Sequence, residues 1–82
     1  MRRAEPSDAS VPLTRLRTRA HAVVASLDRA TDHDRSKLMA LGLIPGAELL
    51  LLQRFPSYVV QVGYTQLALD RETASVIDVR PP

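Results

Sequence analysis

Short apolar runs separated by polar turns dominate the chain, and each run predicts a strand. Small and β-branched side chains favour a first strand at residues 21–27. Later apolar runs predict further strands at 48–54, 58–62, 66–69 and 76–79. The segments between the middle strands, at 55–57 and 63–65, have the length of hairpin connections.

Residues 31–40 have the pattern of a helix. Thr31 begins the helix, since its hydroxyl can accept a hydrogen bond from the backbone N–H of Asp34. The carboxylate of Asp34 can in turn accept from the backbone N–H of Thr31. Gly42 follows the last periodic residue, where a left-handed backbone favours glycine and ends the helix. Pro45-Gly46 is typical of a type II turn that leads into the next strand. Residues 70–73 predict one further capped helical turn.

These elements predict a mainly β domain with one short helix over residues 11–82, preceded by a disordered polar tail at 1–10. The helix falls between the first two of five strands. Such an order favours a small antiparallel β-barrel, because closure removes exposed sheet edges. The N-terminus lacks the apolar segment of a signal peptide, and no apolar run approaches the length of a membrane span.

The composition limits the kinds of site and partner that this chain can have. The chain has no cysteine, which excludes disulfides and thiolate metal sites and fits a reducing compartment. Net charge is only +2, and the arginines are dispersed except for Arg15, Arg17 and Arg19. A small basic barrel that binds nucleic acid through these three arginines is therefore an alternative, but nucleic acid is not the expected partner.

Candidate metal ligands are few. Asp32, His33 and Asp34 are consecutive at a helix start, so their side chains point in different directions, and helix capping accounts for them. A metal-responsive module that uses His21 and His33 with the aspartates is a second alternative. No nucleophile–base arrangement or phosphate-binding glycine loop is present. We therefore predict no catalytic, cofactor-binding or metal residue, and no enzyme.

A protein-binding surface is the remaining possibility. All three aromatic residues fall between positions 55 and 64, next to an arginine, and these residue types dominate interface energies. Four consecutive leucines at 49–52 place two apolar side chains on the outer face of a strand, for a helix or a partner to cover. Alternatively, Phe55 and Tyr58 close one end of the barrel. The candidate partner surface comprises Leu49, Leu51, Arg54, Phe55, Tyr58 and Tyr64.

One stretch resembles a known family. The helix end at 37–43, followed by Pro45-Gly46 and an apolar strand, is similar to the FeoA family of ferrous-iron-transport accessory proteins. The opening Leu13-x-x-Leu16 agrees, and so does the closing pattern of Gly63, Leu67-Ala68-Leu69, Ala74, Ile77 and Val79. The resemblance covers residues 11–81. Family members often carry a glycine before the first strand, where this chain has Arg17-Thr18-Arg19-Ala20.

The resemblance implies an SH3-like β-barrel that is cytoplasmic and needs no cofactor. It also implies a partner, the cytoplasmic GTP-binding domain of the membrane ferrous-iron transporter FeoB. The chain would modulate iron uptake by protein contact, with no direct membrane insertion and with self-association as a further option. The same fold unit occurs at the C-terminus of metal-dependent repressors, but this chain has no room for their DNA-binding helices.

Overall fold

The structure, a computed structural model, describes residues 10–82, so all but the last residue of the predicted tail lies outside the described part. Six strands of the described residues form one sheet, in which neighbouring strands are antiparallel. Their bounds are β1 (Val11–Pro12), β2 (His21–Ser26), β3 (Glu48–Gln53), β4 (Tyr58–Val62), β5 (Thr65–Leu69) and β6 (Asp78–Arg80). The predicted mainly β, SH3-like fold is confirmed.

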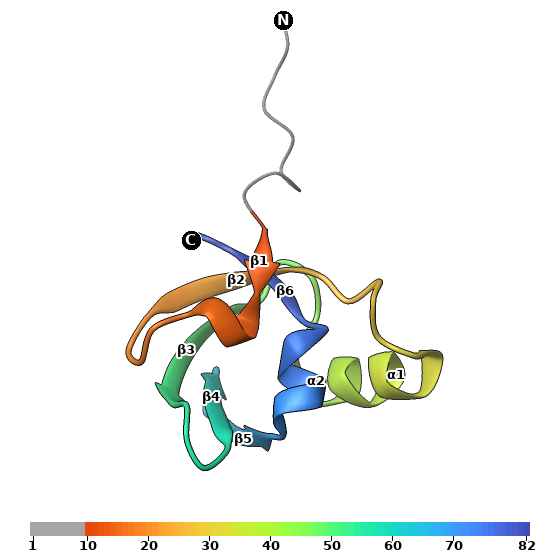
Figure 1. Ribbon diagram of the computed structural model, residues 1–82. Helices are drawn as coiled ribbons and strands as arrows, with labels where there is room; N and C mark the ends of the chain where they lie inside the picture. The colour runs from red at the N-terminus through yellow and green to blue at the C-terminus, as the bar shows by residue number, and fades with distance from the viewer. Residues whose placement is uncertain (1–9) are drawn as a thin grey trace, which may run out of the picture.

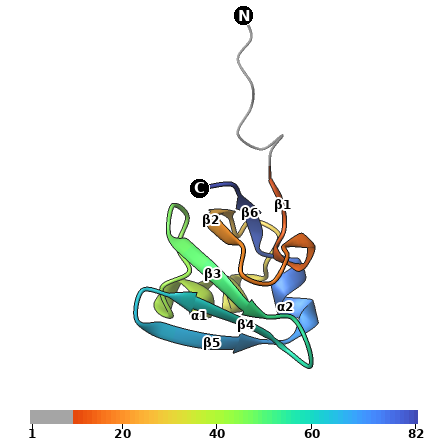
Figure 2. The same cartoon turned by 90° about the vertical axis from the view of Figure 1, so that its left-hand side faces the viewer.

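The strand order along the sheet is β1-β6-β2-β3-β4-β5 (Figures 1 and 2). The two edge strands, β1 and β5, do not pair with each other, so the predicted barrel remains an open, curved sheet. Strand β1 was not predicted, because a two-residue apolar segment has no period to detect. Its register pairs Val11 with Val79 and Pro12 with Asp78.

Helix α1 (Asp32–Ala40) begins as predicted, with the Thr31 hydroxyl accepting from the backbone N–H of Asp34 at 3.1 Å. Two shorter helical segments accompany it, the 3₁₀ helix η2 (Leu13–Arg15) and helix α2 (Arg71–Ser75). Leu38 of α1 and Ala74 of α2 belong to the hydrophobic core. Both helices therefore lie on the inner side of the curved sheet, and no helix of residues 10–82 covers the outer side (Figure 1).

The end of α1 is a Schellman motif built on Gly42. The Gly42 N–H donates to the carbonyl of Met39, and the Leu43 N–H donates to that of Leu38, both at 3.0 Å. Gly42 has φ +103°, which confirms the predicted left-handed end. Leu43 and Leu38 are both buried, so the hydrophobic contact that accompanies this motif is also available.

The Pro45-Gly46 turn is anchored to β2. Gly46 has φ +94°, as the predicted type II turn requires. The Gly46 N–H donates to the Val24 carbonyl, and the Val24 N–H donates to the Ala47 carbonyl, each at 2.8 Å. These two bonds fix where β3 begins relative to β2, and so decide which residues of β3 face the core.

Arg19 is the one residue other than glycine with positive φ, +79°, in the described part of the chain. It lies in the loop between η2 and β2. Its N–H donates to the Leu51 carbonyl at 2.6 Å, so the backbone keeps this conformation despite the Cβ.

Replacing Arg19 with glycine is therefore expected to stabilise the protein by up to about 1 kcal/mol, because glycine adopts this φ without steric cost. Thermal and urea unfolding measure the gain. Arg17→Gly is the control, since residue 17 has no positive φ and should lose stability. A destabilised Arg19→Gly variant would contradict the argument.

Asp70 caps α2, and its carboxylate accepts from the Thr73 backbone N–H at 2.7 Å. This hydrogen bond lowers the pKa of Asp70 below its ordinary value. The contribution of this cap to the free energy of unfolding is present above the ordinary aspartate pKa and is lost as pH falls through the lowered pKa. We expect Asp70→Asn, whose amide oxygen still caps, to show a smaller loss of stability between neutral and strongly acid pH than the parent. Equal pH profiles in chemical unfolding would contradict this.

Candidate functional site: the outer face of the sheet

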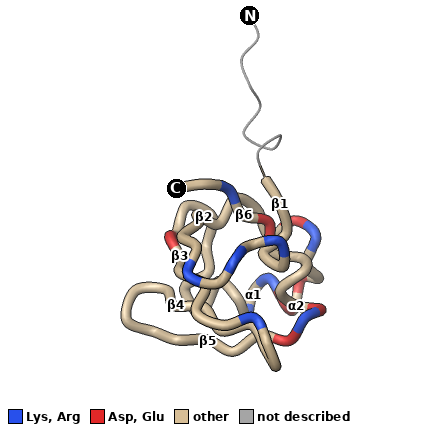
Figure 3. The backbone as a smooth tube through the Cα atoms, turned by 60° about the vertical axis from the view of Figure 1, so that its left-hand side comes forward, with Lys and Arg blue, Asp and Glu red and all other residues tan. Residues whose placement is uncertain are grey.

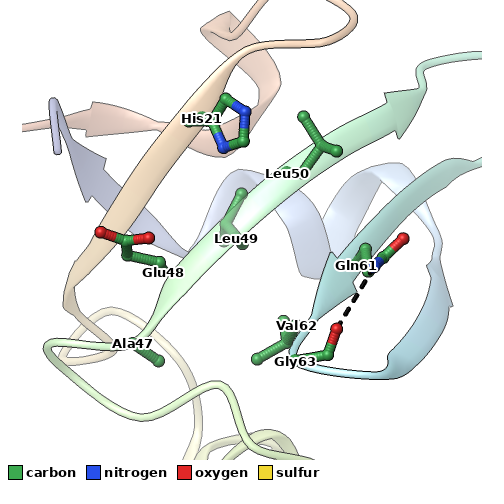
Figure 4. Close-up of a pocket in the computed structure, with 8 residues that line it drawn as sticks. All are labelled: His21, Ala47, Glu48, Leu49, Leu50, Gln61, Val62 and Gly63. Carbon is green, nitrogen blue, oxygen red and sulfur yellow. Dashed lines mark hydrogen bonds between the residues drawn. The ribbon is translucent and has the colours of Figure 1, made fainter.

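The outer face of β2, β3 and β4 forms an open groove (Figure 4). The strand register aligns His21, Leu50 and Gln61 across the three strands. Leu50 and Leu52 are half-buried and lie on the side of β3 opposite the core. We call this the outer groove; its lining includes His21, Ala47, Glu48, Leu50, Gln61 and Val62.

Polar groups surround the apolar floor of the outer groove. His21 and Glu48 are exposed. Gln61 donates from Nε2 to the Gly63 carbonyl at 3.2 Å, which orients its side chain along the strand end (Figure 4). Neighbouring Val59 on β4 is half-buried. A half-buried leucine with a polar rim suits contact with an apolar side chain of another molecule.

The structure corrects half of the predicted partner surface. Leu49, Leu51 and Tyr58 are 2%, 0% and 4% exposed, so their side chains belong to the core. The leucine run alone does not show which two of its residues face the core, because four identical residues have no apolar–polar alternation. Glu48 supplies the missing signal, since an exposed first residue places every second residue, Leu50 and Leu52, on the outer face. The expectation that two of the four leucines face outward is confirmed.

The other predicted surface residues are exposed but lie apart. Phe55, 86% exposed, belongs to the β3–β4 hairpin, where Arg54 also lies. Tyr64, fully exposed, belongs to the β4–β5 turn. These connections flank opposite ends of β4, so they do not form one cluster (Figure 2). Of the two aromatic residues that could alternatively close a barrel end, Tyr58 is buried in the core and Phe55 is exposed.

The candidate metal ligands are not brought together. His21 lies on β2 and His33 on α1. Among residues 10–82, no group of three or more histidine, aspartate or glutamate side chains is placed to hold a metal ion. Asp32 instead accepts from Nη1 of Arg35 at 2.8 Å, within the first turn of α1. No helix within the described residues has the length and apolar character needed to cross a bilayer.

Comparison with known proteins gives a consistent result. The FeoA domain family matches residues 11–81. A crystal structure of an iron uptake regulatory protein, FeoA, is 27% identical, with TM-score 0.78 over 87% of this chain and 95% of that one. The solution structure of FeoA from Chlorobium tepidum is 31% identical, with TM-score 0.80 over 87% of this chain and 70% of that one.

A longer protein shares the fold over part of its chain. IdeR of T. acidophilum is 25% identical, with TM-score 0.85 over 98% of this chain but 37% of its own length. No curated protein matches the chain. The family match spans most of the sequence and agrees with two FeoA structures. The chain therefore belongs to the FeoA family of small accessory domains, and this membership supports a role in ferrous iron transport.

Proposed function

We propose that this protein modulates ferrous iron uptake by docking on the cytoplasmic GTP-binding domain of a FeoB-type transporter. The outer groove supplies the contact, with Leu50 at its centre. The protein acts in the cytoplasm and through contact alone, with no catalysis and no cofactor of its own.

The observation that carries the proposal is the uncovered apolar row on the outer face. Leu50, Leu52 and Val59 are half-buried on the outer side of the sheet, which none of the described helices covers. Apolar anchors surrounded by polar groups are the usual energetic centre of an interface. Family membership supports the transport system as the source of the partner.

Titration of the purified protein with the transporter's cytoplasmic domain tests the proposal. Leu50→Asp is expected to weaken binding by at least about tenfold, because a charge then enters a desolvated apolar contact. Leu50 is not a core residue, so circular dichroism should show a folded variant. Ile44→Asp is the matched control, since Ile44 is 46% exposed and does not line the outer groove.

Two results would contradict the proposal. One is no binding of the parent protein at tens of micromolar. The other is equal weakening by Leu50→Asp and Ile44→Asp, which would place the contact elsewhere or make it a general effect of added negative charge.

A further inference from the structure

Two segments joined by a hydrogen bond carry five exposed side chains, none of which lines the outer groove. Arg15, Arg17 and Arg19 lie in η2 and in the loop that follows it, while Arg54 and Phe55 lie in the β3–β4 hairpin. We call these five residues the arginine face.

Backbone and side-chain contacts bring the loop and the hairpin together. Arg54 donates from Nη2 to the Thr14 carbonyl at 2.9 Å, across 40 positions of sequence. The Arg19 N–H donates to the Leu51 carbonyl at 2.6 Å, and the Leu51 N–H donates to the Ala20 carbonyl at 3.0 Å. These hydrogen bonds fix the loop relative to β3 and to the hairpin, so the two segments that carry the arginine face keep a defined position.

The arginines of the arginine face form no ion pair within residues 10–82. Within the described residues, ion pairs join Arg29 to Asp78 and Arg35 to Asp32, and both use arginines outside this face. Neither segment 13–20 nor segment 51–60 contains an acidic residue. In Figure 3 the basic stretches of the loop and the hairpin lie on the side turned toward the viewer.

Phe55 adds an apolar tip to this charge. Its side chain is 86% exposed, and Pro56 beside it is also exposed. On the same hairpin, the guanidinium carbon of Arg54 lies 6.0 Å from the ring centroid of Tyr58. An exposed aromatic ring among unpaired arginines combines the two attractions that hold proteins at an anionic bilayer surface.

We infer that the arginine face docks on a membrane surface that contains anionic lipids. The arginines contact headgroup phosphates, and the Phe55 ring lies at the boundary between headgroups and acyl chains. A bilayer is favoured over nucleic acid because the single aromatic residue sits on a projecting hairpin, whereas single-strand binders stack successive bases on several rings along a groove. Such contact at the bilayer surface needs no apolar run long enough to span a membrane, so it is compatible with the expected absence of membrane insertion.

The chain contains no tryptophan, so Phe55→Trp provides a single fluorescent reporter at the tip. Mixed with vesicles of phosphatidylcholine and phosphatidylglycerol, this variant should show a blue-shifted emission as the ring leaves water. The shift should disappear at high salt, because counterions screen the arginines. Pure phosphatidylcholine vesicles should give no shift. An unchanged spectrum with anionic vesicles would overturn the proposal.

A charge-matched pair of variants, made in the Phe55→Trp background, locates the contact. Arg17→Gln with Arg19→Gln should weaken partitioning by about 25-fold, at about fivefold per charge near the surface. Lys37→Gln with Arg71→Gln removes the same charge from α1 and α2 and should have little effect. Equal losses from the two pairs would mean that vesicle binding depends only on the net charge of the protein, and would overturn the assignment of this face.

Nucleic acid serves as the competing arm of the experiment. Tighter binding of a single-stranded or duplex oligonucleotide than of anionic vesicles at equal phosphate concentration would also overturn the proposal. No transporter is present in these measurements, so their failure leaves the docking test with Leu50→Asp unaffected, and the reverse also holds.

Discussion

Replacing Leu51 with alanine is expected to lower the free energy of unfolding by about 2–5 kcal/mol, the range for removing a buried leucine side chain. Leu51 is fully buried at the centre of the sheet, between its partners on β4 and the loop before β2. For a domain of this size each kcal/mol shifts the melting temperature by about 4–8 °C, so a fall of about 8–40 °C is expected. Urea unfolding and calorimetry measure both quantities.

Leu50→Ala is the matched control on the same strand. The Leu50 side chain points to the outer groove and is half-buried, so its truncation should cost clearly less than that of Leu51. Similar losses from both variants would mean that the outer face is covered in solution, for example by self-association. Repeating the unfolding at different protein concentrations would then reveal that association.

Replacing Gly42 with alanine is expected to cost about 1–3 kcal/mol, because a side chain must adopt a backbone conformation that only glycine tolerates. Gly42 has φ +103°, a left-handed value beyond the narrow range of about +50° to +70° that residues with a Cβ can enter. The space itself is adequate, since an added Cβ would lie 3.7 Å from Cγ1 of Val62. The expected loss is therefore conformational, and chemical unfolding of Gly42→Ala measures it.

Gly63→Asn is the control, because it replaces a glycine at a backbone conformation that asparagine can also adopt. Gly63 has φ +61°, within the left-handed region that asparagine visits, and an added Cβ there meets nothing within 4 Å. That variant should lie close to the parent in stability. If Gly63→Asn destabilises the protein as much as Gly42→Ala does, the special role of the Schellman motif would be refuted.

Local signals predicted much of this fold. Thr31, Gly42 and Gly46 marked the helix start, the helix end and the turn, and the structure places each in the expected backbone conformation. Strand β4 has the predicted bounds, Tyr58–Val62. These signals depend on hydrogen bonds and φ angles within a few residues, so the sequence alone contains them.

Signals that depend on distant parts of the chain were not available from sequence. The two-residue strand β1 exists because β6 pairs with it. Phe55 and Tyr58 are close in sequence, yet one is exposed and the other buried, because only Tyr58 belongs to the inward row of β4. The arginine face likewise required the contact between Arg54 and Thr14 before the three clustered arginines gained their neighbours.

The position of β6 has a consequence for the order of folding during synthesis. Strand β6, at Asp78–Arg80, lies between β1 and β2 in the sheet. Strands β2 to β5 pair with their sequence neighbours and can associate as soon as they leave the ribosome. The first strand must instead wait for residues almost seventy positions later, from Val11 to Val79. We expect the amides of β1 and β6 to gain protection from hydrogen exchange last, because closing such a long loop is slow.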